Sequence, residues 1–143
     1  MTTRYDSDFY GWTQEQAELL RSGNINQLDL DNLLEEIEAM GRSERREFES
    51  RLEVLLAHLL KWQFQPIRQS RSWTSTINLQ RKKVSRCLKE SPSLKHRLEA
   101  SLSDAYEDAV SYASKETGLP ESHFPASCPW TFNQIIDSEF YPE

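Results

Sequence analysis

Hydrophobic residues recur along this chain at alternating steps of three and four, which is the spacing of one face of an α-helix. The widest such face lies in the segment from about residue 44 to residue 63. Its main stripe consists of Phe48, Leu52, Leu55, Leu59 and Trp62, and it is broadened by Val54, Leu56 and Leu60. A helix that is apolar over more than half of its circumference must be surrounded by other elements. We therefore expect 44–63 to be the central helix of the fold.

Three more stripes with the same spacing predict the other main helices. They are Leu30, Leu33, Leu34, Ile37 and Met40; Trp73, Ile77, Gln80, Val84 and Cys87; and Leu94, Leu98, Leu102, Ala105, Ala109 and Tyr112. No segment alternates β-branched and polar residues over the length of a strand. The pattern predicts an all-α fold, a single domain over residues 1–143 in which short helices at either end accompany a bundle of four main helices.

Glycines, capping residues and prolines predict the boundaries of these elements. Three glycines each follow an amphipathic run, where a left-handed glycine commonly ends a helix: Gly23, Gly41 and Gly118. Thr13 and Thr131 each precede a glutamine by three residues, as in a capping box that begins a short helix. Between 118 and 130, three prolines stand among aromatic residues, so we expect this segment to lie over the bundle as an extended coil.

The composition fits one globular domain of 143 residues with a formal net charge of −6, which argues against a dedicated nucleic-acid binder. The N-terminal residues have no secretory-signal pattern, and no apolar run approaches the roughly 18 residues needed to span a bilayer. Cys87 and Cys128 form no CxxC pair, so free thiols in a reducing cytoplasm are expected. We therefore predict a cytoplasmic protein with no membrane contact.

Two polar residues interrupt the apolar arc of the central helix. Arg51 and His58 lie seven residues apart on one strip, and each needs a partner because an unpaired buried charge is costly. The available partners are Glu35 and Glu36 of the preceding helix. We favour the interpretation that these four residues form a buried polar cluster that sets the register of two helices. The alternative is a metal or acid–base site, but Leu55 stands where a helix-bundle metal site has the glutamate of Glu-x-x-His, so neither a metal ion nor another cofactor is expected.

Positive charge is concentrated in one block, residues 61–89, which holds eight basic and no acidic side chains. The segments 1–60 and 90–143 each carry a net charge of −7. The block also contains aromatic residues, and arginines beside aromatics are typical of single-stranded nucleic-acid grooves and phosphate sites. We favour the alternative that the block faces acidic helices of its own fold or of a partner subunit, since charge runs are usually solvated faces or complementary pairs.

Within this block, "QPIRQSRSWTSTI" (65–77) predicts a turn between two helices. The residue before Pro66 avoids helical geometry, so the central helix ends there, and Ser72 is the expected cap of the next helix. Arginines at a turn leading to a helix N-terminus form an anion-friendly corner. The candidate residues for binding an anion or a partner are Lys61, Arg68, Arg71, Trp73, Arg81 and Lys82. In the alternative, Trp73 closes the end of the bundle and the arginines pair with nearby carboxylates.

Sequence motifs nominate no catalytic chemistry. With four glycines in the chain, no phosphate-binding loop of the Walker or dinucleotide type can be written. GxSxG, HExxH and the Cys–His spacings of zinc sites are all missing from the sequence. Accordingly, no catalytic residue is predicted.

Seven short segments, in order across nearly the whole chain, carry a family resemblance. They are "DFYGW" (8–12), "LDLDNLLEEIEAMG" (28–41), "LLAHLLKWQFQP" (55–66), "SWTSTI" (72–77), "SPSL" (91–94), "CPWT" (128–131) and "FYP" (140–142). They resemble the bacterial family called domain of unknown function twenty-nine. The resemblance implies a compact, mostly helical bacterial domain, usually a stand-alone protein, and it transfers no catalytic residue. The family's recurring motif includes the positions of Glu35, Glu36, His58, Lys61, Trp62, Gln65, Pro66 and Trp73, which suggests one neighbourhood.

Three functions remain, in order of preference. The first is a helical interaction module without catalytic activity, which binds a protein partner or a second copy through apolar packing and the contrast between basic block and acidic flanks. The second is binding of a nucleic acid or phosphate ligand through residues 61–89. The third is a small enzyme or metal protein centred on Glu35, Glu36 and His58.

Overall fold

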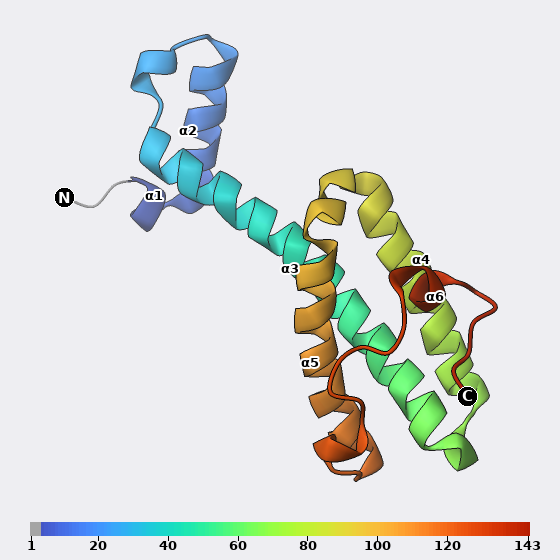
Figure 1. Ribbon diagram of the computed structural model, residues 1–143. Coiled ribbons are helices and arrows are strands. Elements are labelled where there is room, and N and C mark those ends of the chain that lie inside the picture. The colour runs from blue at the N-terminus through green and yellow to red at the C-terminus, as the bar shows by residue number, and fades with distance from the viewer. Residues whose placement is uncertain (1–3) are drawn as a thin grey trace. The chain divides into compact units, whose positions relative to one another are not determined.

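In the computed structural model, which describes residues 4–143, every regular element is an α-helix or a 3₁₀ turn (Figure 1). The α-helices are α1 (Arg4–Ser7), α2 (Phe9–Arg21), α3 (Leu30–Phe64), α4 (Arg71–Glu90), α5 (Leu98–Thr117) and α6 (Phe132–Ile136). The 3₁₀ turns are η1 (Ile25–Gln27), η2 (Pro66–Arg68), η3 (Pro92–Arg97) and η4 (Glu121–His123). The predicted all-α bundle is confirmed. Within the same range, no helix is both long enough and apolar enough to cross a bilayer.

The chain forms two compact units, the first ending at Ser43 and the second running from Glu44 to Glu143. The first unit contains α1, α2, η1 and the N-terminal part of α3. The second unit contains the rest of α3 together with α4, α5 and α6.

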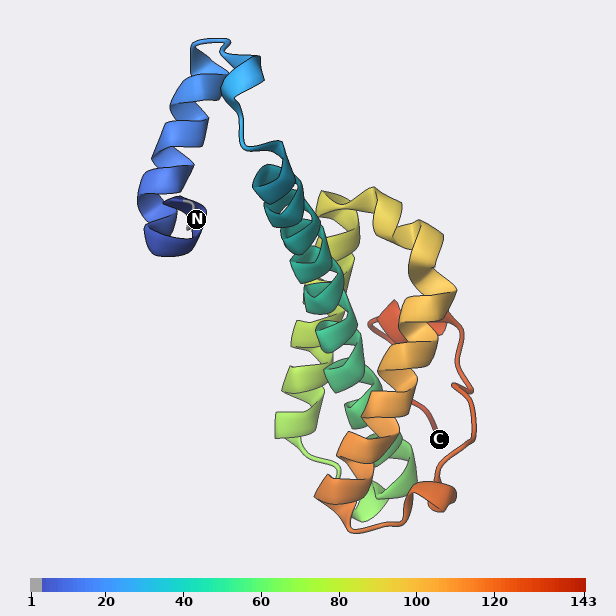
Figure 2. The same cartoon turned by 90° about the vertical axis from the view of Figure 1, so that its left-hand side faces the viewer.

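The second unit is built around the C-terminal part of α3, which lies between α4 and α5 in both views (Figures 1 and 2). This part of α3 buries Phe48, Leu52, Leu55, Leu56, Ala57, His58, Leu59, Leu60 and Lys61. Ile77 and Val84 of α4, Ala105, Ala109 and Ala113 of α5, and Ile135 of α6 lie in the same core. The helix with the widest apolar arc is therefore the central one, because neighbours cover it on several sides.

Residues 118–143 follow α5 and return along the second unit (Figure 1). Phe124 and Trp130 of this segment are buried in the core. The hydroxyl of Tyr106 on α5 donates a hydrogen bond of 2.7 Å to the carbonyl oxygen of Pro125. The predicted capping box at Thr131 begins α6. Aromatic burial and this hydrogen bond thus hold a segment that has little helix of its own.

Gly41 does not end a helix, contrary to the prediction from sequence. Residues 30–64 form one continuous helix, and the glycines with a positive φ are Gly23 and Gly118, at 79° and 76°, as expected for helix ends. The helix continues past Gly41 because no proline follows before Pro66 and because the next turns are rich in Glu and Arg, which favour helix. Two ion pairs at i,i+4 spacing support those turns: Arg45–Glu49 at 3.8 Å and Arg51–Glu47 at 3.0 Å.

Two helices begin earlier than predicted because an upstream side chain provides the cap. The carboxylate of Asp8 accepts the backbone N–H three residues later at 3.1 Å, so α2 already includes Thr13. Likewise, the hydroxyl of Ser70 accepts a backbone N–H at 3.3 Å, so Ser72 lies in the first turn of α4. In contrast, α5 begins late, because residues 92–97 form the 3₁₀ turn η3.

In the first unit, polar and aromatic contacts fix α2 to the start of α3. The indole Nε1 of Trp12 donates to Asp29 Oδ2 at 3.0 Å, and Gln16 Oε1 accepts from the backbone N–H of Asp29 at 2.8 Å. The rings of Tyr5 and Phe9 pack on Trp12 with centroid distances of 4.8 and 5.6 Å. Trp12 is the large apolar side chain that this unit buries among its described residues.

The continuous α3 predicts opposite effects of alanine at two glycines. Gly41→Ala raises the free energy of unfolding by about 0.5–1 kcal/mol, because alanine favours a helix interior and its Cβ meets no atom within 4 Å. Gly118→Ala lowers it by about 1 kcal/mol or more, because φ is +76° there. Urea unfolding followed by circular dichroism measures both variants, and a destabilised Gly41→Ala protein would contradict the unbroken helix.

Candidate functional site

A lysine lies buried between aromatic rings at one end of the second unit. The ammonium of Lys61, near the end of α3, is 4.9 Å from the ring centroid of Trp73 on α4 and 6.0 Å from that of Tyr112 on α5. Lys61 is 7% exposed, and within residues 4–143 its ammonium has no ion pair or hydrogen bond. Burial lowers the pKa of Lys61, and the Glu116 carboxylate partly opposes this shift. The faces of the two rings also stabilise the charged form.

His58 lies one turn before Lys61 and is also buried, at 7% exposed. Its Nδ1 is 2.8 Å from the carbonyl oxygen of Val54, so in the neutral ring Nδ1–H donates to that oxygen. The imidazole ring packs 6.1 Å from the ring of Tyr112. Burial lowers the pKa of His58, and the positive charge of Lys61 lowers it further. One cluster therefore contains Lys61, His58, Trp73 and Tyr112. The sequence pattern did not predict Tyr112 as a member, because it identified this residue only as part of an apolar stripe.

The structure does not bring Glu35, Glu36, Arg51 and His58 together. All four lie on α3, and side chains of one helix meet at spacings of three or four residues, so the glutamates are not on a helix that faces His58. Glu36 accepts a hydrogen bond from the Tyr5 hydroxyl, which raises the pKa of Tyr5 to about 12. Arg51 pairs with a glutamate one turn away on its own helix. Nor do three His, Cys, Asp or Glu side chains gather anywhere in residues 4–143 as a metal site would need.

Arg81 was predicted to be part of an anion-binding corner, but it binds the backbone of the C-terminal segment instead. It is 4% exposed, and its Nε and Nη2 donate to the carbonyl oxygens of Ile135 and Phe140 at 2.8 and 2.5 Å. Its guanidinium also lies 5.2 Å from the ring centroid of Tyr141. Arg81 therefore holds the C-terminal segment against α4. Its hydrogen bonds go to carbonyl oxygens of this chain and not to a bound anion.

Most of the remaining cations of the block are exposed, and Lys83 is partly buried. Arg68 in η2 and Arg71 and Lys82 in α4 are exposed, and Arg86 and Lys89 extend the same exposed side of α4. Across the described chain, no ion pair within 4.0 Å involves a residue of the block 61–89. The favoured expectation that the block pairs with acidic helices of its own fold thus has no direct contact to support it. We call Arg71, Lys82, Arg86 and Lys89 the basic face of α4.

An apolar row runs along the N-terminal part of α3 in the first unit. It consists of Leu30, Leu34, Ile37 and Met40, which are 64%, 57%, 59% and 60% exposed. The sequence pattern identified this stripe as a helix face, and the structure leaves it uncovered. Asp31 and Glu38, seven residues apart, flank the row on one side and are exposed. Among the described residues neither carboxylate has an ion pair or hydrogen bond.

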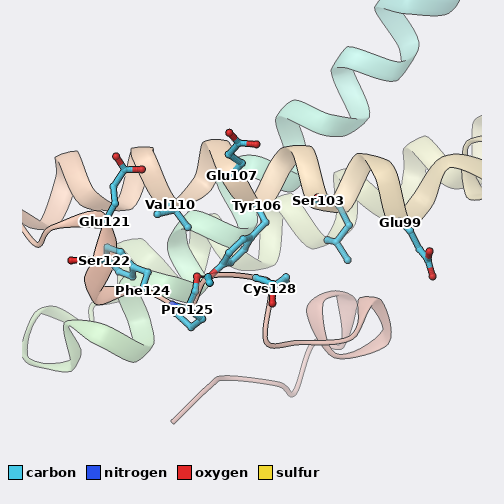
Figure 3. A pocket seen from close by; sticks show the side chains of 13 residues that line it. Glu99, Ser103, Tyr106, Glu107, Val110, Glu121, Ser122, Phe124, Pro125 and Cys128 are labelled. Carbon is cyan, nitrogen blue, oxygen red and sulfur yellow. The ribbon is translucent and has the colours of Figure 1, made fainter.

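Two grooves open on the surface of the second unit, and local spacing in the sequence indicated neither. The first, of about 740 Å³, lies between α5 and the segment 121–128, where Figure 3 shows Tyr106 pointing toward Pro125 and Cys128. The second, of about 500 Å³, lies where α4, the turn η3 with the start of α5, and α6 meet. We call it the lysine groove; its apolar lining is Leu88, Leu98, Phe132 and Ile136, and its cations are Lys89 and Lys95. Each groove combines segments that are distant in sequence, which is why periodicity could not reveal it.

The buried cluster predicts an unusual titration of His58. Its pKa lies below 6.5, the ordinary value for histidine, and Lys61→Met raises it because a nearby positive charge is removed. Since the unfolded chain takes up this proton first, the free energy of unfolding falls as pH decreases below 6.5. NMR titration of the imidazole measures the pKa, and His96→Gln serves as an exposed control for the unfolding series. A His58 pKa at or above 6.5 would contradict the buried, neutral ring.

Comparison with known proteins gives a family but no activity. The family model described as "Domain of unknown function DUF29" matches residues 4–141, so the chain belongs to this family. No curated protein and no solved structure shows significant similarity to the chain. The surfaces of the protein itself therefore carry the indications of its function.

Proposed function

We propose that this chain is a helical protein-interaction module and that its binding surface is the apolar row of α3. The observation that supports the proposal is the exposure of Leu30, Leu34, Ile37 and Met40, each more than half accessible on one side of a single helix. Exposed apolar patches rimmed by polar residues are typical of protein-binding surfaces, and helix faces with this spacing are commonly recognised as i, i+4, i+7 anchors.

The small core of the first unit supports the same proposal. Among its described residues, Gly11, Trp12 and Gln16 are the buried ones. Segments of about 40 residues usually need a disulfide, a metal or another chain to be stable. Covering four half-exposed apolar side chains is worth on the order of 5 kcal/mol before the cost of association. A bound partner would therefore supply burial that this unit lacks.

The charges around the row indicate the chemistry of the partner. Residues 1–43 hold three basic and nine acidic side chains, a net charge of −6. Asp31 and Glu38 lie directly beside the row and have no partner of their own among residues 4–143. The partner surface is thus expected to be apolar at its centre and basic at its edge.

The setting proposed for this interaction is the bacterial cytoplasm. Cys87 and Cys128 are free thiols, which fits a reducing compartment. Because burial raises the pKa of both thiols, they stay protonated at neutral pH and are poor nucleophiles.

Polar substitution within the row is predicted to abolish binding. The double variant Leu34→Ser, Ile37→Ser removes two anchors, so any complex of the wild-type chain weakens at least tenfold. Sedimentation measures self-association, and quantitative capture from host extract, with each captured protein identified, measures binding to other proteins.

The control for this experiment is Leu79→Ser, which removes an exposed leucine of α4 outside the row. It is expected to leave binding unchanged. The proposal fails if the wild-type chain binds nothing in either measurement, or if the double variant binds as the wild type does.

The basic face of α4 favours a second candidate function, binding of single-stranded nucleic acid. Arg71, Lys82, Arg86 and Lys89 are exposed and have no ion pair in the described chain, so their charge is available to phosphates. The aromatic residues that would stack on bases are partly buried within the second unit, which makes this candidate weaker.

Salt dependence tests the second candidate. If four phosphates are contacted, affinity for a labelled single-stranded oligonucleotide falls about 50-fold between 50 and 200 mM salt. Lys82→Glu, Arg86→Glu should abolish binding at the lower concentration. Fluorescence anisotropy gives both affinities, and no binding of the wild type at 50 mM salt rejects this candidate.

A further inference from the structure

We propose that the apolar row of one chain docks in the lysine groove of a second copy, and that the two copies exchange this contact reciprocally. This inference rests on the proposed function, because it names the partner for the same row. Both halves of the contact are present on the surface of this one chain.

The lysine groove has the chemistry that the row requires. Leu88, Leu98, Phe132 and Ile136 line it with apolar atoms from α4, α5 and α6. Lys89 and Lys95 border it, and both are exposed. Neither lysine forms an ion pair with a carboxylate in the part of the chain that the structure describes. The groove is thus apolar at its centre and basic at its edge.

The row presents the complementary arrangement. Leu30, Leu34 and Ile37 follow one side of α3 at helical spacing, as knobs that enter an apolar groove do. Asp31 and Glu38 stand beside them on the flank of the helix, about 10 Å apart along its axis. When the apolar side chains enter the groove, the two carboxylates meet its edge, where the two lysines lie. Docking therefore buries apolar surface and pairs two unpaired charges on each side.

A second copy is the partner that satisfies both surfaces at once. A foreign protein that covered the row would leave the lysine groove open, whereas a two-fold pair of chains fills both rows and both grooves. Exchange about a two-fold axis closes the two contacts on themselves and gives a dimer, whereas docking of each copy in the next would give an open chain of subunits. The contrast between acidic and basic segments of the sequence then serves recognition between copies.

Charge reversal tests this assignment. In variant A, Asp31→Lys with Glu38→Lys makes the row basic; in variant B, Lys89→Glu with Lys95→Glu makes the groove acidic. Each variant alone faces like charges at both contacts, so its dimerisation weakens at least tenfold relative to the wild type. An equimolar mixture of A and B restores both contacts and is expected to form a heterodimer. Sedimentation equilibrium from 1 to 500 µM, with one variant fluorescently labelled, measures all of these states.

The control is Arg46→Glu with Lys115→Glu, which changes the net charge by the same amount as variant B but alters two exposed cations that line neither the row nor the lysine groove. It is expected to dimerise as the wild type does. Circular dichroism checks that each variant keeps its helix content, and recovery of dimer in the A–B mixture shows independently that both variants are folded.

Several results would overturn the inference. They are a monomeric wild type at 500 µM, a dimer that variant B leaves intact, a ladder of larger oligomers, or an A–B mixture that stays monomeric. If the wild type is monomeric but captures a foreign protein that Leu34→Ser, Ile37→Ser loses, the inference fails while the proposed function stands. If it is monomeric and captures nothing, both fail.

Discussion

Burial of one apolar face of α3 is the constraint on which this molecule depends. Leu34, Ile37, Phe48, Leu52, Leu55 and Leu59 follow a single side of the helix at steps that keep them aligned. From Phe48 onward this side is fully buried by the other helices of the second unit. Before Gly41 the same side is more than half exposed. The apolar face is therefore covered over one part of the helix and uncovered over the other, which is why we propose association as the function.

The cations of the second unit are divided between internal and external roles. Lys61 and Arg81 are buried and are stabilised by aromatic rings and, for Arg81, by carbonyl oxygens; no carboxylate of residues 4–143 lies within ion-pair distance of either. Burying these groups is tolerable because their long stems are apolar, both charged ends face aromatic rings, and Arg81 also has two carbonyl acceptors. The cations on the outer side of α4 and beside the lysine groove keep their charge available. The basic block 61–89 therefore has two roles that the sequence does not distinguish: two of its cations are buried within the fold, and others are exposed and can bind a partner.

Much of the fold could be predicted from the sequence because core burial imposes the spacing of three and four residues. That spacing predicts the main helices and the central position of 44–63. The predicted helix end at Gly41 is wrong, because the preference of glycine against helix is worth only about 1 kcal/mol and neighbouring residues outweigh it. The expected cluster of Glu35, Glu36, Arg51 and His58 depended on a break at Gly41, so it does not assemble. The pairing of Lys61 with Trp73 and Tyr112, and of Arg81 with the C-terminal segment, joins residues 12 to 59 positions apart. Local periodicity carries no information about such contacts.

The central claim is that the N-terminal part of the α3 face is open in the isolated chain, and solvent accessibility of its methyl groups tests this most directly. Methyl NMR in dilute solution with a soluble paramagnetic agent compares Leu34 and Ile37 with Leu52 and Leu56 of the same helix. The account predicts strong broadening of the first pair and little broadening of the second. Equal protection of all four methyl-bearing residues would show that the chain covers this face itself, and would contradict the account.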